Sequence, residues 1–280
     1  MNNAVADESV TAELKYLLPS DETPVYYASE GGKEAQLELS GEFETRRISI
    51  TDARYQQQKD ELKRYSLDRE GFTFTSHAVS IANFYDESEI KKTYLPEAEN
   101  LVKNITGASR VLAFDATFRS DAKDVREVNN SREPSTVVHN DYTARSAPQR
   151  VRDILGDETA SDLLKRRFSI VNVWRPLKNP VLTSPLAVCD AQSVEPEDLV
   201  AVERHAKDRI GELLLANYNP KHKWYYFKRM QADEALLIKT FDSLNDGSAT
   251  SCIHTAFLMP DTPENVPPRE SIEVRLFVFY

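Results

Sequence analysis

The chain has 280 residues, and its 35 Lys and Arg against 45 Asp and Glu give a formal net charge of −10. Hydrophobic residues make up 40 % and charged residues 29 %, which is typical of a globular protein and excludes a disordered chain. The acidic balance argues against nucleic acid as a partner, because a phosphate-binding face needs clustered Lys and Arg. No run of about 18 apolar residues exists, so no membrane span is expected.

The start of the chain and its cysteines indicate a reducing compartment. Residues 1–10 are polar and acidic and lack the basic and apolar regions of a signal peptide. Cys189 and Cys252 form no disulfide framework and no CxxC motif. We therefore expect a cytoplasmic protein. The glycines form neither GxGxxG nor a phosphate loop, which argues against a Rossmann cofactor site and P-loop chemistry.

Helical and extended patterns alternate in the first part of the chain. Apolar residues at helical spacing predict a helix that ends at Gly107 and that Pro96 interrupts. A later helical region has Ser146 as the expected N-cap and a break near Gly156. The expected elements are helices over residues 10–18, 86–105 and 146–164, and strands over 46–51 and 110–118.

From Phe168 onward the hydrophobic period changes to two, which predicts strands. Seven short strands are expected, over residues 168–174, 186–189, 210–218, 224–230, 235–241, 252–257 and 271–280. Their number and the turn residues between them favour an antiparallel sandwich or barrel of jelly-roll type. We predict one domain over 1–280, mainly β with flanking helices. Residues 1–105 would form an N-terminal helical or mixed wrap, and 106–280 the β core.

Three residues in extended segments form a candidate metal site. His139 and Asp141 are two residues apart, so on an extended segment both side chains point to the same face. His254, in an apolar β segment, could complete the two-His-one-carboxylate triad of non-haem Fe(II) oxygenases. Two alternatives stay open at this point: His139 as an ordinary loop histidine, and His254 as a hydrogen-bonded core residue.

A second motif near the C-terminus is suited to binding a carboxylate. Arg269 and Ser271 share one face of the last strand, and Arg275 lies on the same face by parity. A guanidinium with a neighbouring hydroxyl suits the far end of a dicarboxylate. The alternative is an ion pair with Glu270 or Glu273. A His-x-Asp pair, a distant His and then Arg-x-Ser is the order found in Fe(II)/2-oxoglutarate oxygenases with a double-stranded β-helix (a cupin-like jelly roll).

Nine short segments, in order over nearly the whole chain, carry a family resemblance. They are Tyr65–Asp68 with Gly71 and Phe72, Thr106–Val111, Val138–Asp141, Asn172–Leu177, Pro185–Asp190, Asn219 and Pro220 with Trp224–Tyr226, Lys239–Ser243, His254–Phe257 and Pro267–Arg275. On these segments the chain resembles the gibberellin desaturase and cephem methoxylase-like family of fungal and bacterial secondary metabolism.

The resemblance implies an Fe(II)/2-oxoglutarate-dependent dioxygenase. It implies His139, Asp141 and His254 as iron ligands, and Arg269 with Ser271 or Arg275 as the anchor for 2-oxoglutarate. With O2, such an enzyme would hydroxylate, desaturate or oxidatively cyclise a small-molecule substrate in secondary-metabolite biosynthesis. Neither nucleic acid nor a membrane is expected as a partner.

Two other functions fit parts of the pattern. A catalytically silent β-sandwich that binds a small ligand would hold no iron, and a zinc hydrolase could use the same three ligands but leaves Arg269 and Ser271 without a role. The sequence leaves open which of Arg269 and Arg275 binds the co-substrate. It also leaves open the substrate, the reaction outcome, the oligomeric state and the roles of Arg175, Tyr225 and Lys239.

Overall fold

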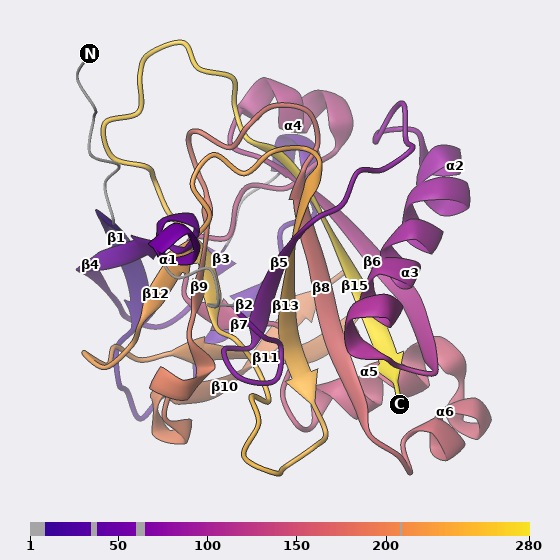
Figure 1. Cartoon of the computed structure of the whole chain (residues 1–280). Helices are drawn as coiled ribbons and strands as arrows, with labels where there is room; N and C mark the ends of the chain where they lie inside the picture. The colour runs from indigo at the N-terminus through magenta and orange to yellow at the C-terminus, as the bar shows by residue number, and fades with distance from the viewer. Residues whose placement is uncertain (1–8, 35–37, 60–64, 208) are drawn as a thin grey trace.

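Two sheets organise the computed structural model, which describes residues 9–34, 38–59, 65–207 and 209–280 (Figure 1). Within these residues the larger sheet has ten strands and the smaller sheet five. In spatial order the larger sheet contains β1 (Ser9–Leu17), β4 (Phe43–Asp52), β12 (Trp224–Tyr226), β9 (Leu186–Cys189), β14 (His254–Ala256), β7 (His139–Asn140), β11 (Arg209–Ala216), β10 (Leu199–Ala206), β2 (Val25–Tyr27) and β3 (Glu38–Leu39). The smaller sheet contains β5 (Phe72–Ser76), β13 (Glu234–Asp242), β8 (Phe168–Pro176), β15 (Glu270–Phe279) and β6 (Arg110–Ser120).

The smaller sheet is buried on both faces at its centre. All nine residues of β8 are buried, because β13 and β15 flank it in an antiparallel arrangement and side chains cover it from both sides. On the inner face, Trp174 and Ile238 pack against Val188 of the larger sheet. The ring of Tyr225 lies in this inner core, 5.3 Å from that of Tyr65, which assigns it a packing role. The mainly β architecture with flanking helices is as predicted.

The helices of the described residues are α1 (Ala53–Lys59), α2 (Glu87–Glu89), a π-helical segment (Ile90–Tyr94), α3 (Leu95–Thr106), α4 (Lys123–Asn129), α5 (Ser146–Leu155) and α6 (Asp157–Leu163), with short 3-10 turns at Gly32–Glu34, Ala191–Ser193 and Pro196–Asp198. The stretch from α2 to α3 covers the outer face of the smaller sheet, and α5 and α6 lie at its lower end (Figure 1). Helix α1 lies beside β4 of the larger sheet, and α4 lies at the top of the view. Val102 of α3 packs onto Val171 and Val274 of the sheet.

The long helical stretch begins and ends where the sequence indicates. The Asp86 carboxylate accepts the N–H groups of Ser88 and Glu89, and Gly107 ends the helix in the left-handed conformation, at φ 68°. The expected interruption takes the form of the π-helical segment just before Pro96, where proline offers no N–H to the helical ladder. Ser146 is the first residue of α5 and not its N-cap, which is Arg145.

The helix expected over residues 10–18 is wrong. This segment forms strand β1, which pairs with β4 in an antiparallel register from Ser9 opposite Thr51 to Leu17 opposite Phe43. Its burial alternates, with Ala12, Leu14 and Tyr16 inside, so the pattern had a period of two.

The N-terminal third of the chain contributes strands to both sheets. β1 and β4 extend one side of the larger sheet, and β5 forms an edge of the smaller one. The strand expected over 46–51 is confirmed within β4. Strand β10 was not predicted. The single-domain organisation with a boundary near residue 105 stays a prediction, but strands from both sides of that position share both sheets.

Candidate metal centre

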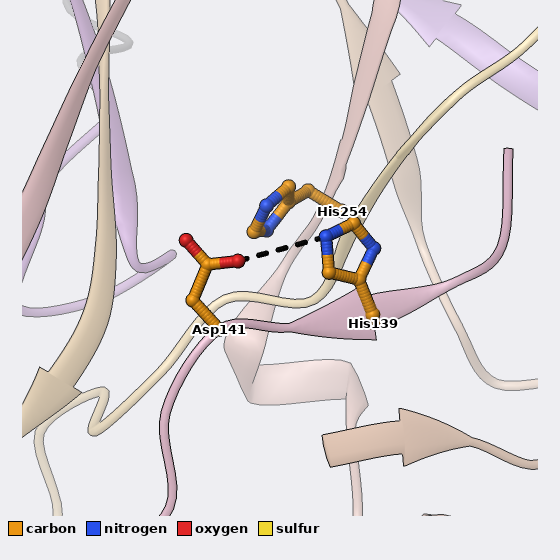
Figure 2. A group of neighbouring side chains, drawn as sticks. All are labelled: His139, Asp141 and His254. Carbon is orange, nitrogen blue, oxygen red and sulfur yellow. Dashed lines mark ion pairs between the residues drawn. The ribbon is translucent and has the colours of Figure 1, made fainter. Parts of the chain in front are cut away.

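Two short strands of the larger sheet bring three potential metal ligands together (Figure 2). His254 of β14 lies directly opposite His139 of β7 in the antiparallel pair. Asp141 follows two residues after His139 and turns to the same side. One ligand atom from each of the three side chains lies within 4.8 Å of the others. The histidines are only 6 % and 2 % exposed. The structure therefore places together the three residues that the sequence singled out.

Both imidazoles are held in one orientation by the backbone. Nδ1 of His139 lies 2.8 Å from the carbonyl oxygen of Val137, and Nδ1 of His254 lies 3.0 Å from that of Cys252. A carbonyl oxygen only accepts, so each Nδ1 carries the proton and donates. In a neutral ring held in this way the lone pair is on Nε2, which is the arrangement that metal-binding histidines adopt.

The Asp141 carboxylate is held through one of its two oxygens. Oδ2 accepts hydrogen bonds from Asn172 Nδ2 and from Arg275 Nε, each at 2.8 Å. Oδ1 instead lies 3.7 Å from Nε2 of His139. The carboxylate thus directs one oxygen towards the imidazoles, while the smaller sheet holds the other.

The charge states of the cluster suit a divalent cation. Burial, together with the neighbouring His254, lowers the pKa of His139 to about 3, so its ring stays neutral at physiological pH. Burial by itself would raise the pKa of Asp141, but Arg275 outweighs it and holds this pKa well below its usual range. Imidazole nitrogens free of protons and an ionised carboxylate are the donor set of a non-haem Fe(II) site, so these residues fit that metal.

The guanidinium of Arg275 forms ion pairs with three carboxylates. It pairs with Asp115 at 2.7 Å, with Asp141 at 2.8 Å and with Glu273. Burial would lower the pKa of Arg275, but these three carboxylates outweigh it and hold the pKa well above its usual value. Its position opposite Asn172 in the β8–β15 register explains why both side chains reach Asp141.

Arg269 lies in a different electrostatic environment. It is 2 % exposed, and its Nε donates to Ser271 Oγ at 3.0 Å while Nη1 donates to the carbonyl oxygen of Ser184 at 2.8 Å. The guanidinium lies 5.0 Å from the Trp174 ring centroid. Among the described residues no carboxylate oxygen lies within 4.0 Å of the guanidinium nitrogens, although Asp121 Oδ1 accepts the backbone N–H of Arg269 at 2.9 Å. Burial, and next the nearby Arg119, lower the pKa of Arg269 to about 9.

A buried guanidinium without a counter-anion is costly, so this position suits an anionic ligand. Arg269 lines one small cavity together with His139 and His254. Glu273 lies on the same wall, but it is paired with Arg275. The contacts therefore favour Arg269 over Arg275 as the residue that faces a carboxylate beside the metal cluster.

Two residues whose roles were open have structural partners elsewhere. Arg175 is fully buried and donates to the carbonyl oxygen of His77 at 2.9 Å. Lys239 pairs with Asp68 at 2.7 Å and with Asp242 at 2.8 Å. Neither residue is among the described residues that line three cavities with His139, Asp141 or His254 in their walls.

Asn172 was missed as a functional residue at the sequence level. The signal for it is an amide in the middle of the apolar segment Phe168–Trp174, since a buried amide needs polar partners. Its partners are Asp141 and the hydroxyl of Thr240, whose Oγ1 lies 3.4 Å from Asn172 Oδ1.

Comparison with known proteins places the chain beside oxygenases. A family model described as an oxidoreductase/YMDC permease-like domain matches residues 14–279. The chain is 36 % identical over 238 residues to the hydroxylase/desaturase efuI of Hormonema carpetanum, covering 77 % of this chain and 79 % of that protein. It is 33 % identical over 254 residues to the Fe(II)/2-oxoglutarate-dependent dioxygenase nvfI of Aspergillus novofumigatus, covering 88 % of each.

A solved structure agrees with these sequence relatives. The iron and alpha-ketoglutarate-dependent endoperoxidase NvfI superposes with a TM-score of 0.84 at 30 % identity, over 97 % of this chain and 98 % of that one. Fe(II)/2-oxoglutarate oxygenases have a jelly-roll fold, so the predicted double-stranded β-helix is confirmed. In the described part of the chain, no helix is long and apolar enough to cross a membrane.

Proposed function

The chain belongs to this family of Fe(II)/2-oxoglutarate-dependent dioxygenases, and from that premise we propose that His139, Asp141 and His254 are its iron ligands. The enzyme oxidises a small molecule in secondary-metabolite biosynthesis, using Fe(II), 2-oxoglutarate and O2. The observation that carries the ligand assignment is the convergence of one ligand atom from each of His139, Asp141 and His254 within 4.8 Å, with both Nδ1 atoms hydrogen-bonded to backbone carbonyls.

When bound, the iron supplies oxidation by O2 coupled to conversion of 2-oxoglutarate to succinate and CO2. The protein presents three ligands on one side of the metal, and a facial triad of this kind leaves positions for co-substrate and O2. A zinc hydrolase built on the same ligands would leave the buried charge of Arg269 without a partner, and a silent binding module would not need free Nε2 atoms. Both alternatives therefore rank lower.

Arg269 is proposed to bind the distal carboxylate of 2-oxoglutarate. Its guanidinium is buried, has no carboxylate partner among the residues that the structure describes, and shares a cavity with both histidines. The carbonyl oxygen of Ser184 and the hydroxyl of Ser271 hold two of its nitrogens, so the planar fork is oriented before the co-substrate arrives. Since the Ser271 oxygen accepts from Arg269, its own O–H can donate to the same carboxylate.

Arg275 is proposed as a positioning residue and not as a co-substrate anchor. With Asn172 it holds Oδ2 of Asp141, which leaves Oδ1 for the metal. Partners that orient a ligating carboxylate in this way tune metal affinity without touching the metal.

The anaerobic visible spectrum with Fe(II) and 2-oxoglutarate tests these assignments. A bidentate oxo acid on Fe(II) should give a weak charge-transfer band in the wild type. The band should vanish in His254→Ala. In Arg269→Ala it should appear only at a higher 2-oxoglutarate concentration than in the wild type. Arg46→Ala, which removes an exposed arginine, is the matched control and should behave as the wild type. A folded wild-type protein that gives no band would overturn the proposal.

The reaction outcome depends on how the substrate lies beside the metal. Hydroxylation, desaturation and ring closure all begin with attack on a C–H bond, so the pocket decides the product by orienting the substrate. A cytoplasmic location, and the absence of nucleic-acid or membrane partners, stay predictions from composition.

A further inference from the structure

A second cavity, of about 210 Å³, has Asp141 in its wall. Its walls carry five arginines, namely Arg132, Arg150, Arg204, Arg209 and Arg275. They come from separate parts of the chain: the loop before β7, helix α5, strand β10, the start of β11 and strand β15. The protein as a whole is acidic, so this concentration of positive charge is local and calls for an explanation.

The carboxylates in the walls are already paired. Asp115 and Asp141 are both held by Arg275. Glu212 pairs with Arg145 and accepts the hydroxyl of Thr143. In the described part of the chain, none of these three carboxylates lies within 4.0 Å of the other four arginines of the wall.

The remaining arginines have few partners of their own. Arg209 lies 3.9 Å from Asp153, which is a long ion pair. Nowhere in the described ranges does a carboxylate come within 4.0 Å of Arg132, Arg150 or Arg204, and Nε of Arg150 is buried without a hydrogen-bond partner. Like charges gathered in this way repel one another, so the cluster costs stability unless an anion joins it.

Neighbouring positive charges also affect the pKa values of two of these arginines. Burial, and next Arg119 and Arg204, lower the pKa of Arg132. Burial, and next Arg150, lower the pKa of Arg209.

The arginine cavity shares Asp141 and three of its arginines with a narrower cavity. The narrower cavity is lined by Arg132 and Arg204 together with His139 and Asp141. The cavity that contains Arg269 includes neither Arg132 nor Arg204. Two cationic positions thus border the metal cluster, one with Arg269 and one with Arg204, and Arg119 and His139 line the cavities of both.

We propose that the arginine cavity binds the substrate through a carboxylate, and that the substrate of this enzyme is a small organic acid. This inference rests on the proposed function, which assigns the position at Arg269 to 2-oxoglutarate. The guanidinium fork of an arginine matches a carboxylate. The Tyr142 side chain, also in the wall, could add a neutral donor. A carboxylate bound there leaves the carbon skeleton of the acid next to Asp141 and the metal.

The test measures binding without turnover. Protein loaded with Zn(II) in place of Fe(II), and saturated with 2-oxoglutarate to fill the position at Arg269, is titrated with 4-fluorobenzoate and with 4-fluorobenzamide, and binding is followed by fluorine NMR. We expect the acid to bind at least about ten-fold more tightly than the amide, since only the acid forms charge-assisted hydrogen bonds.

Two variants locate the binding. Arg132→Gln and Arg204→Gln should each weaken 4-fluorobenzoate about ten-fold while the amide is unaffected. Arg46→Gln is the matched control and should change neither ligand. Equal affinity for acid and amide, no binding of the acid to the wild type, or acid binding that survives in both variants would overturn the inference.

The anaerobic charge-transfer band, recorded on the same proteins with Fe(II), separates this inference from the proposed function. If the band forms normally in the wild type and in both variants while acid binding behaves as predicted, the cavity serves the substrate. If Arg204→Gln raises the 2-oxoglutarate requirement as Arg269→Ala does, the cavity serves the co-substrate and the inference is wrong. Absence of the band from the wild type overturns the proposed function, and this inference with it.

Discussion

Nε of Arg275, on the last strand, donates to Oδ2 of Asp141 at 2.8 Å, although the two residues lie 134 positions apart in the sequence. This contact joins the two sheets at the metal cluster. It holds a carboxylate in its ionised form and turns one of its oxygens towards two histidines. The smaller sheet thereby orients a ligand that belongs to the larger one.

Asn172→Ala should weaken Fe(II) binding by about 10- to 100-fold, the usual effect of losing a partner that orients a metal ligand. The variant removes one of two hydrogen bonds to Oδ2 of Asp141 but leaves all three ligands in place. Competition with a fluorescent chelator under anaerobic conditions measures the affinity. Asn219→Ala, which removes an amide bound to Asp198 elsewhere, is the control. An unchanged iron affinity in Asn172→Ala would contradict the positioning role.

Arg275→Met should destabilise the metal-free protein by about 3–5 kcal/mol, because it leaves buried carboxylates without their cation. Asp141 and Glu273 are largely buried, with side chains 11 % and 6 % exposed. Urea denaturation followed by circular dichroism gives the free energy of unfolding. The double variant Arg275→Met with Glu273→Gln should recover part of the loss. Single-variant stability close to that of the wild type would show that the carboxylates relax into solvent.

The metal-free protein should lose stability as the pH falls from about 6.5 towards 3. The pKa of His139 is about 3 in the folded chain, whereas an exposed histidine, as in the unfolded chain, has a pKa of 6.5. Between these two pH values the unfolded chain therefore binds one proton more than the folded chain. Each such group lowers the free energy of unfolding by up to about 1.4 kcal/mol per pH unit as the pH falls. Asp141, whose folded pKa is also lowered, adds a loss of the same sign at the acidic end of the window.

Urea denaturation at a series of pH values tests this dependence. In His139→Gln the free energy of unfolding should depend less steeply on pH between pH 6 and 4, because the titrating ring is gone. The difference should correspond to the uptake of about one proton on unfolding. His205→Gln removes a partly exposed histidine and serves as the control. A wild-type slope that equals that of His139→Gln would show that this imidazole is already protonated in the folded protein.

Arg204→Gln should leave the melting temperature of the ligand-free protein unchanged or higher. The variant removes one positive charge from a cluster whose members repel one another and breaks no ion pair among the described residues. Residues kept for binding often cost stability in this way. Scanning calorimetry at low and high salt measures the effect, which salt should reduce. A clear drop in the melting temperature would instead assign Arg204 a structural role.

Local patterns in the sequence were sufficient for the strand-rich class and for the ligand pair His139 and Asp141. Strand periodicity and the two-residue spacing on an extended segment depend only on neighbouring residues, so they can be seen without the fold. The candidate His254 and the Arg269–Ser271 motif were also visible, because a polar residue in an apolar strand needs a reason to be there.

Only the tertiary structure decided how these candidates relate. It placed His254 opposite His139 through strand register and paired Arg275 with carboxylates, whereas the Arg269 guanidinium has no carboxylate partner within the described ranges. The segment predicted as an N-terminal helix is strand β1 in the structure. Arginines from elements far apart in the sequence line one cavity. The physical reason is the same in each case: whether a charge is paired and which strands are neighbours depend on residues far away in the sequence, and folding alone brings those residues together.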